Sequence, residues 1–351
     1  MVKSNKKPIV ENPLLSIIIP HHGGFKILNN CLTSLNKSTF TNHEIILVDN
    51  KSKDDSVSQI KNKFPYVNIL TQNNNLGYAG GCNIGATKAK GKFLLFLNND
   101  TIHDSEWIQP LIELISKDNS IGSIQPKVLN INNNKLFDYA GGSGGFLDIF
   151  CYPFIRGRIF NSIEEDKNQY DNQQDIFWTS GCAFITRKDL FLRILFDRKL
   201  FAYMEEIDYS WKVQLSGYKN IIEPKSIIYH SGGTLNDRNF LKSYLNHRNS
   251  MILFLTNHNF LFMLFLLLPK MILEMASLLR YFLTANFKAF IAQLFALIWI
   301  LFHPFYIIKR IIQVNRIKKV SLISITKKMY KPSIVFDYFI LGKKKYSELI
   351  D

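Results

Sequence analysis

The sequence has few cysteines and lacks the spacing patterns that mark several protein classes. Its four cysteines, Cys31, Cys82, Cys151 and Cys182, form neither a CxxC pair nor a cluster. This argues against a zinc-bound or disulfide-stapled scaffold and favours a reducing compartment. No apolar run of signal-peptide length precedes the first predicted strand, so we expect the protein to stay on the cytoplasmic side.

Two common nucleotide-binding fingerprints are also absent from the glycine-rich stretch 73–83, NNNLGYAGGCN. No GKS or GKT follows it, which excludes a P-loop, and it has no G-x-G-x-x-G dinucleotide motif. It does contain Gly77, Gly80 and Gly81 ahead of NIGATKAK, which predicts a helix. Glycines before a helix N-terminus let the backbone approach a ligand, and such a helix end suits a diphosphate.

Acidic residues are scarce relative to basic ones, with 28 Asp and Glu against 43 Lys and Arg and a net charge of +15. The excess is uneven, because residues 309–345 hold eleven Lys or Arg and Asp337 as the one acid. This basic segment follows long apolar stretches, an arrangement that favours an anionic membrane surface over nucleic acid.

Short apolar runs alternate with polar or helical connections over residues 14–231, the rhythm of an α/β protein with a mostly parallel sheet and flanking helices. At 351 residues the chain can hold one catalytic domain, residues 1–250, and a C-terminal apolar, helical, membrane-associating region, residues 251–351. We interpret the Asn- and Gly-rich stretch 118–175 as long surface loops. The runs are 14–19, 44–48, 67–70, 92–97, 121–124, 183–186 and 227–229.

The C-terminal region contains two strongly apolar segments. Residues 260–268 are too few to span a bilayer and are expected to end at Pro269 and Lys270. Residues 289–308 are long enough but are interrupted by Gln293, His303 and Pro304. Two spans, a re-entrant hairpin, in-plane helices and the core helices of a soluble domain all remain open.

Polar residues follow several predicted strands and should converge at one edge of the sheet. Asp49 can accept a hydrogen bond from the N–H of a uracil or thymine ring, or serve as a turn aspartate. Asp100, after the apolar FLLFLNN, suits Mg²⁺ coordination, or the N-cap of a helix over 101–115. His230 is either a further metal ligand or structural.

A cluster of three carboxylates, Glu205, Glu206 and Asp208, opens an amphipathic helical segment. The helix dipole accounts for acids at this position, but one of them can also act as the general base that sugar transfer to a hydroxyl requires. Upstream, Trp178 in WTSGCAFITR can stack on a sugar ring or belong to the core.

Taken in order, SIIIPHHGG, VDNKSKDDS, NNLGYAGGCNIG, FLLFLNND, WTSGCAFITR, FAYMEEIDYSWK, IIYHSGG and HRNSM closely resemble the family-2 glycosyltransferases of GT-A fold, and among them the bacterial rhamnosyltransferase-like branch. The resemblance covers residues 14–250. It implies an inverting transferase that uses a nucleotide-diphospho-sugar and Mg²⁺ or Mn²⁺.

The resemblance also assigns roles residue by residue. It makes Asp49 the nucleobase contact, Asp100 the metal ligand with His230 beside it, and Glu206, after Glu205, the catalytic base. The DxD-like element reads NND here, with Asn98 at its first position, which is common in the branch and leaves Asp100 as its one carboxylate. Residue 206 departs from the family pattern, because it is Glu where the family has Asp. The expected substrate-binding residues are Pro20, Asp49, Asn75, Gly77, Gly80, Gly81, Asn83, Asn98, Trp178, Gly181 and Asp208.

The sequence therefore predicts an enzyme of polysaccharide biosynthesis in the bacterial cell envelope. It would move a sugar from a dTDP- or UDP-sugar to a hydroxyl of a lipid-linked or surface polysaccharide acceptor, at the cytoplasmic face of the membrane, with no nucleic-acid partner. Two alternatives remain. One is a sugar-1-phosphate nucleotidyltransferase, although the lysine-bearing G-x-G-T-R-like loop of that class is absent after the first strand, and the other is a non-catalytic membrane-bound scaffold of the same fold.

Overall fold

The computed structural model describes residues 10–231 and 240–350, and its first third alternates strands and helices. Short apolar runs such as LSIIIPH and FLLFL form strands with almost no exposed side chain, as expected when helices cover both faces of a sheet. The elements are β1 (Leu15–His21), α1 (Phe25–Asn36), β2 (His43–Asp49), α2 (Ser56–Lys63), β3 (Asn68–Thr71), α3 (Gly77–Lys88) and β4 (Phe93–Leu97).

The central sheet has ten strands within the described residues and is mixed. Along the order β12-β14-β6-β13-β4-β1-β2-β3, the pairs among β1, β2, β3 and β4 are parallel, whereas β13 runs antiparallel to both of its neighbours. Strand β5 pairs with β14, and β7 with β6. The remaining elements are β5 (Thr101–His103), α4 (Ile108–Lys117), β6 (Ile121–Asn130), β7 (Asn133–Phe137), β12 (Gln174–Ile176), β13 (Ala183–Arg187), α5 (Lys188–Ile194), α6 (Glu205–Leu215) and β14 (Lys219–His230).

The stretch 118–175 is not the set of surface loops that its composition predicts. After β6 and β7 it folds into a second, four-stranded sheet of order β11-β10-β9-β8. The strands are β8 (Gly145–Leu147), β9 (Pro153–Ile155), β10 (Arg158–Ile159) and β11 (Ser162–Ile163). Their apolar side chains, Phe154 and Ile159 among them, are buried against the C-terminal part of the chain, a long-range contact that local composition cannot reveal.

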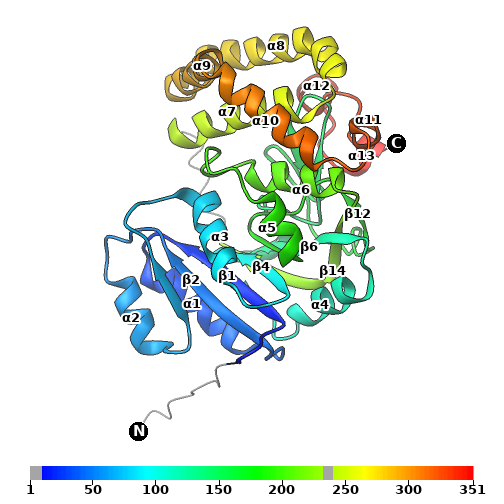
Figure 1. Cartoon of the computed structure of the whole chain (residues 1–351). Coiled ribbons are helices and arrows are strands. Elements are labelled where there is room, and N and C mark those ends of the chain that lie inside the picture. Colours follow the sequence, from blue (N-terminus) through cyan, green and yellow to red (C-terminus); the bar gives the residue numbers. More distant parts are fainter. Residues whose placement is uncertain (1–9, 232–239, 351) are drawn as a thin grey trace.

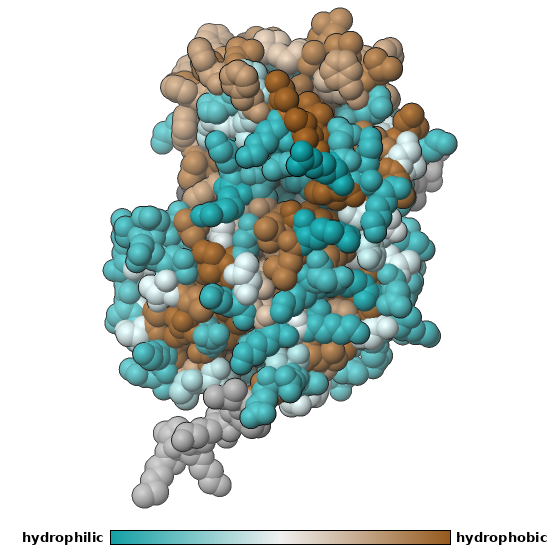
Figure 2. Space-filling view, in the orientation of Figure 1, coloured by the Kyte–Doolittle hydropathy of each residue, from teal (hydrophilic) through white to brown (hydrophobic). Residues whose placement is uncertain are grey.

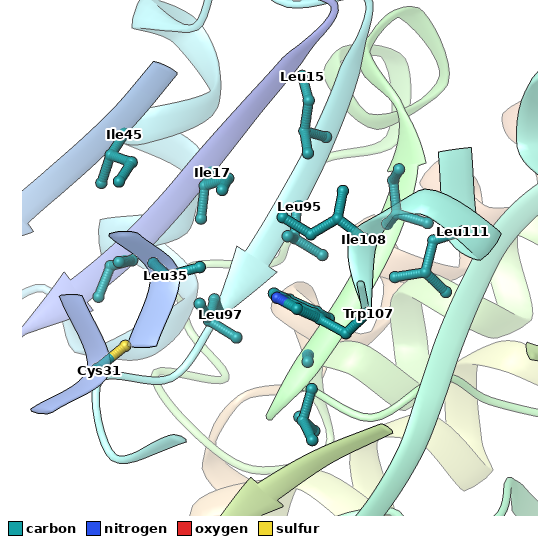
Figure 3. Close-up of a cluster of buried hydrophobic side chains, with 14 of the residues drawn as sticks. Leu15, Ile17, Cys31, Leu35, Ile45, Leu95, Leu97, Trp107, Ile108 and Leu111 are labelled. Atoms are coloured by element: carbon teal, nitrogen blue, oxygen red, sulfur yellow. The ribbon is translucent and has the colours of Figure 1, made fainter. Parts of the chain in front are cut away.

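A hydrophobic core fills the space between the sheet and helices α1 and α4. Figure 3 shows side chains from β1, α1, β2, β4 and α4 pointing toward one another, with Trp107 among them. Trp107 is 1% exposed. This core fixes the positions of β1, β2 and β4, whose carboxyl ends carry several of the predicted site residues. The labelled residues are Leu15, Ile17, Cys31, Leu35, Ile45, Leu95, Leu97, Trp107, Ile108 and Leu111.

The C-terminal part of the chain is helical and lies over one end of the sheet domain (Figure 1). The predicted end of the first apolar segment at Pro269 is wrong, because α8 continues through Pro269 to Leu283. The second segment is broken at His303, where α9 and α10 differ in direction by 76°. The helices are α7 (Phe240–Asn257), α8 (Phe260–Leu283), α9 (Phe287–Phe302), α10 (Pro304–Ile317), α11 (Leu322–Thr326), α12 (Ile334–Phe339) and α13 (Ser347–Ile350).

Length and apolar composition make α8 one candidate membrane span among the described helices, and the bent pair α9–α10 a second if it counts as a single span. The predicted division of the chain at residue 250 falls inside α7. That helix packs against both α6 and α9, so it joins the sheet domain to the helical layer. The division into two domains stays a prediction.

A buried ion bridge joins this helical layer to the sheet domain. Arg310 of α10 is 1% exposed and pairs with Asp197 and, at 2.6 Å, with Asp208 of α6. Lys212 and Asn257 also donate to Asp208, at 2.6 and 2.9 Å. Burial alone would raise the pKa of Asp208, but Arg310 and Lys212 outweigh it and lower the pKa to about 2, so the carboxylate stays charged.

We expect Arg310→Met to lower the free energy of unfolding by about 3 kcal/mol, because it leaves Asp197 and Asp208 buried without their guanidinium partner. Urea unfolding followed by circular dichroism in a mild detergent measures the change. The matched control is Lys309→Met, which removes the same charge from an exposed position of the same helix and should change stability by less than about 0.5 kcal/mol. Equal effects of the two substitutions would contradict a structural role for the bridge.

Candidate active site

The carboxyl ends of β1, β2 and β4 meet at one edge of the sheet, as predicted. His21 and Asp49 are directly paired in register, and the Nδ1 of His21 lies 2.8 Å from the side-chain amide of Asn99 beyond β4. Asp49 is 5% exposed, and its Oδ1 accepts a hydrogen bond of 2.8 Å from the N–H of Ser52. That bond is the one expected of a turn aspartate. Pro20 lies at the same edge, beside Gly81 of α3.

Asp100 and His230 are brought together by the antiparallel pairing of β5 with β14, in which His230 lies opposite Thr101. The Nε2 of His230 lies 3.2 Å from Oδ1 of Asp100. Residues 101–103 form a strand and the next helix begins at Ile108, so Asp100 is not the N-cap of a helix over 101–115.

Sequence reasoning missed a third member of this group, Asp138. Its Oδ1 lies 2.9 Å from Nδ1 of His230, and the side chain is 2% exposed. An imidazole held by a carboxylate on one nitrogen presents the other nitrogen in a fixed direction, here toward Asp100. Burial opposes a charge on His230, but Cys182, Asp100 and Asp138 around it outweigh burial and raise its pKa well above the usual value, so a cation bound here would have to displace the imidazole proton. The one local signal in the sequence is that Asp138 follows the apolar pair Leu136 and Phe137 and directly precedes the turn-like YAGG.

The residues at this point fit a divalent cation whose other ligands come from a substrate. Oδ1 of Asp100 is buried and makes no well-aligned hydrogen bond, and the amide of Asn98 lines the same cavity. Magnesium commonly takes one or two carboxylates together with substrate phosphates. Within residues 10–231 and 240–350, no group of three or more His, Cys, Asp or Glu side chains is arranged to hold an ion by itself. Phosphate oxygens of a substrate could complete the coordination of a cation here.

Glu205 and Glu206 form the first turn of α6, together with Asp208. The loop before them is strained, since Phe201, Tyr203 and Met204 have φ values of 66°, 67° and 70°. Left-handed backbone at three non-glycine residues is costly and is typical of functional sites, where surrounding structure holds it in place. The left-handed conformation of Met204, the N-cap residue, sets where helix α6 begins and therefore where Glu205 and Glu206 lie.

The two glutamates each keep one side-chain oxygen, Oε2, buried and without a hydrogen-bond partner. Burial raises the pKa of Glu206 to about 7, and burial together with the neighbouring Glu206 charge raises the pKa of Glu205 well above its usual range. Glu205 is 4% exposed, whereas Glu206 is only partly buried. A cavity carboxyl with a pKa near neutrality has the property that a general base needs.

A single cavity of about 470 Å³ unites these groups. It contains seven of the predicted site residues: Asn98, Asp100, Trp178, Gly181, Glu205, Glu206 and His230. Sequence reasoning missed the aromatic and basic residues that form the rest of its wall, mainly because several come from the small sheet and from α7. They include Tyr78, Tyr139, Phe154, Arg158, Phe160, Tyr203 and Lys242.

Trp178 makes the contacts of a core residue and also lines the cavity. Its indole N–H donates to the carbonyl of Phe146 at 2.7 Å, and one part of its ring rests on the backbone of Gly145, as a core residue would. The side chain nevertheless lines the cavity. Stacking on a sugar ring therefore stays a prediction.

The three predicted glycines lie inside α3, not ahead of it, because the helix begins at Gly77. They allow close packing: a Cβ on Gly77 would lie 2.3 Å from the carbonyl of Phe201, one on Gly80 would meet Leu76, and one on Gly81 would meet Asn50. Two backbone N–H groups in the first turn of α3 already have hydrogen-bond partners within the protein. Gly77 donates to the side chain of Asn75 at 2.9 Å, and Ala79 donates to the carbonyl of Phe201 at 3.1 Å. The structure gives Asn75 and the glycines positions that support the loop before Glu205.

Two further predicted substrate contacts lie outside the cavity. The amide of Asn83 both donates to and accepts from the backbone of Phe196, at 2.9 and 3.0 Å, and so tethers α3 to the chain after α5. Asp208 is 0% exposed and bonded to Arg310, Lys212 and Asn257. Its position corrects the prediction of a substrate contact, because an enclosed carboxylate with three partners is a structural group.

The arrangement as a whole defines a class of protein. A parallel sheet edge with Asp49 at the end of β2 and Asp100 in the turn after β4, and a cavity that joins Asp100 to the two glutamates of α6, are features of nucleotide-sugar glycosyltransferases of GT-A fold. The model of "Glycosyl transferase family 2" matches residues 16–194, just over half of the chain. The chain therefore belongs to glycosyl transferase family 2, and the predicted family and fold are confirmed.

Individual relatives agree with this assignment. The chain is 28% identical over 194 residues to glycosyltransferase GlyG of Streptococcus pneumoniae, a match that covers 52% of this chain and 60% of that protein. It is 21% identical over 247 residues to the N-acetylglucosaminyl-diphospho-decaprenol L-rhamnosyltransferase of Mycobacterium tuberculosis, covering 66% of this chain and 80% of the relative. The fold is similar to the crystal structure of GalNAc-T7 with UDP, GalNAc and Mn²⁺, with a TM-score of 0.52 and 23% identity over 62% of this chain and 42% of that one.

Proposed function

We propose that this glycosyltransferase moves one sugar from a dTDP- or UDP-sugar to a hydroxyl of a lipid-linked or surface polysaccharide acceptor, with inversion at the anomeric carbon. The observation that carries the proposal is the single cavity shared by the Asp100–His230 pair and the Glu205–Glu206 pair. A relative that acts on a diphospho-decaprenol-linked sugar supports a lipid-linked acceptor. The protein would work at the cytoplasmic face of a bacterial membrane.

The donor would occupy the sheet edge. Asp49 would bind the base, with Pro20 beside it, and Asn98 and Asp100 would lie near the diphosphate. Asp100 and His230, the latter oriented by Asp138, are the residues that would hold Mg²⁺ or Mn²⁺, and a bound cation would offset the charge that develops on the diphosphate. The remaining work falls to the protein's own side chains, which would position the two substrates in one cavity.

The acceptor hydroxyl would lie within hydrogen-bond reach of Glu206. As the hydroxyl oxygen forms its bond to the anomeric carbon, the bond from that carbon to the donor phosphate oxygen breaks, and its electron pair leaves with the nucleoside diphosphate. Glu206 takes the hydroxyl proton. Attack from the face opposite the leaving group inverts the configuration. The Oε2 of Glu206, buried and without a hydrogen-bond partner, supports this role, because it can accept a proton without first giving up a protein contact.

The proposal is tested by thermal unfolding of the detergent-solubilised protein with dTDP, UDP, GDP or CMP, each with and without Mn²⁺. A ligand that binds only the native state stabilises it, by about 2.7 kcal/mol at one hundred times its dissociation constant. We expect dTDP or UDP to raise the melting temperature only when Mn²⁺ is present, and GDP and CMP to have smaller effects. If no nucleotide shifts the melting temperature with or without the ion, the proposal of a nucleotide-sugar site is wrong. A non-catalytic scaffold then becomes the better interpretation.

A further inference from the structure

The helical layer carries a large, continuous apolar surface on its outer side. Side chains of α8, α9 and α10 that would normally be buried are mostly open, as with Phe265 at 77%, Phe302 at 78% and Phe305 at 84% exposed. Figure 2 shows hydrophobic side chains gathered over the end of the molecule where these helices lie. Monomeric soluble proteins rarely expose contiguous apolar area on this scale, so the surface calls for an apolar partner.

Lys270 and Glu274 of α8 and Gln293 of α9 point the opposite way, into the protein. Lys270 and Glu274 of α8 are 0% and 1% exposed and form an ion pair of 2.9 Å. Glu274 also accepts from Gln293 of α9 at 2.6 Å and from the hydroxyl of Tyr152, before β9, at 2.9 Å. The layer therefore buries several polar side chains while most of its large apolar side chains are exposed, unlike a helix that faces water, whose exposed side is polar.

Helix α8 is long enough to cross a bilayer but is attached to the protein along its whole length. Its 24 residues correspond to about 36 Å. The inward side chains Met263, Leu266, Lys270, Glu274 and Leu278 recur every three or four residues and are all buried. A crossing orientation would have to pull Glu274 and Lys270 away from Tyr152 and Gln293. Helix α8 therefore lies on the protein, with only its outer face available.

Charge around this surface is of one sign. Between Phe260 and Thr326 the sequence has a single acid, Glu274, which is the buried one. Exposed bases lie on and beside the apolar helices, at Arg280, Lys288, Lys309, Arg316, Lys318 and Lys319. Apolar side chains bordered by exposed Lys and Arg match the interface of a bilayer with anionic headgroups.

We propose that α8, α9 and α10 form an in-plane docking surface for an anionic lipid bilayer, inserted to the level of the headgroups and outer acyl chains, with α8 parallel to the membrane and not crossing it. The inference rests on the proposed function, because it defines how the membrane partner named there is bound. Helix α7 packs against α9 and contributes Lys242 and Asn246 to the cavity wall. One helix therefore separates the bilayer from the site where a lipid-linked acceptor would react.

The depth of labels along α8 tests the proposal. All four native cysteines are buried, so single exposed cysteines introduced as Leu261→Cys, Leu268→Cys and Leu279→Cys can be labelled selectively with an environment-sensitive fluorophore. The full-length proteins are mixed with phosphatidylcholine vesicles, with or without phosphatidylglycerol, that carry quenchers at known depths. We expect the three labels to report the same shallow depth, and only with the anionic vesicles. Ile27→Cys on α1, also exposed, is the matched control that should stay in water.

Each other outcome overturns the inference. A depth that changes steadily from residue 261 to 279 would show a span, and labels that all stay in water would show that no bilayer binds. As an independent check, the double variant Phe265→Ser and Leu268→Ser should weaken vesicle binding by roughly tenfold or more, while Ile27→Ser leaves it unchanged. Neither measurement uses a nucleotide or turnover, so failure of the docking surface is distinguishable from failure of the proposed transferase activity.

Discussion

Replacing Glu206 by Gln is expected to lower the turnover number for sugar transfer by about 10²–10⁴-fold, the contribution typical of a positioned general base. Glutamine keeps the size of the side chain but cannot accept a proton from the acceptor hydroxyl. The KM for the donor and the nucleotide-dependent rise in melting temperature should be unchanged, because Glu206 contacts the acceptor side of the cavity in the proposed mechanism. Steady-state kinetics with a lipid-linked acceptor and both substrates varied separately measures the effect.

The pH dependence identifies the base more directly. The pKa of Glu206 is about 7, so kcat/KM of the parent enzyme should rise about tenfold per pH unit below that value and level off above it. This rising limb of the pH–rate profile should be missing in Glu206→Gln. Glu205→Gln is the comparison variant, since Glu205 is the deeper neighbour. If the limb disappears in Glu205→Gln and persists in Glu206→Gln, Glu205 is the base.

The pH dependence of the free energy of unfolding provides a control for Glu206→Gln, because its direction follows from the raised pKa. A carboxyl whose pKa is raised by folding binds its proton more tightly in the native state, so the free energy of unfolding falls as pH rises from about 4.5 to about 7. Glu206→Gln removes the ionisable carboxyl and therefore removes its contribution to this loss of stability at high pH. The variant should therefore be at least as stable as the parent at pH values above 7, and a loss of turnover there cannot be attributed to unfolding.

Replacing Asp100 by Ala is the second substitution with a large expected effect. We expect metal-dependent turnover to fall by about 10²–10³-fold, the loss typical when one group that stabilises developing charge is removed. The reason is that Asp100 lines the cavity and its Oδ1 is buried without a well-aligned hydrogen bond among the residues that the structure describes. In the thermal assay the variant should also lose the Mn²⁺-dependent part of the stabilisation by dTDP or UDP.

Asp104→Ala is the matched control for Asp100. Asp104 follows β5, is exposed and does not line the cavity. Its removal should leave turnover and the Mn²⁺ effect unchanged. A fully active Asp100→Ala enzyme that keeps its Mn²⁺ response would remove Asp100 from the cation site, whatever the outcome at Glu206.

Local sequence was enough to predict the parts of the site that follow strands. Asp49 comes directly after an apolar run and Asp100 follows another after two asparagines. Strand ends in an open α/β sheet converge by topology, so their shared edge could be predicted without knowledge of contacts. The local sequence was likewise enough to predict that the acids Glu205, Glu206 and Asp208 begin a helix. Asp138 was not, because its contact with His230 joins residues 92 positions apart and depends on the pairing of β6 with β14.

Helix α8 shows a second limit of local reasoning. A proline within an apolar run predicts a helix end, since it removes one hydrogen bond and crowds the preceding turn. In α8 the residues on both sides of Pro269 pack on the same protein surface, with Leu266 and Lys270 buried. This packing and the Lys270–Glu274 pair favour continuation of the helix, and neither can be read from the run of letters around the proline.

The return of the C-terminal segment to the small sheet has a consequence for how the chain folds as it is synthesised. The carboxylate of Asp148 accepts from the N–H of Ile334 at 3.1 Å, and Glu164 accepts from the N–H of Tyr346 at 3.1 Å. Those partners leave the ribosome more than 180 residues after the strands they stabilise. The sheet edge that carries Asp49 can form early, whereas the wall that carries Phe154 and Phe160 must wait for residues 334–346. In the proposed mechanism, a chain that stops before them would have the donor-binding edge without the complete acceptor cavity.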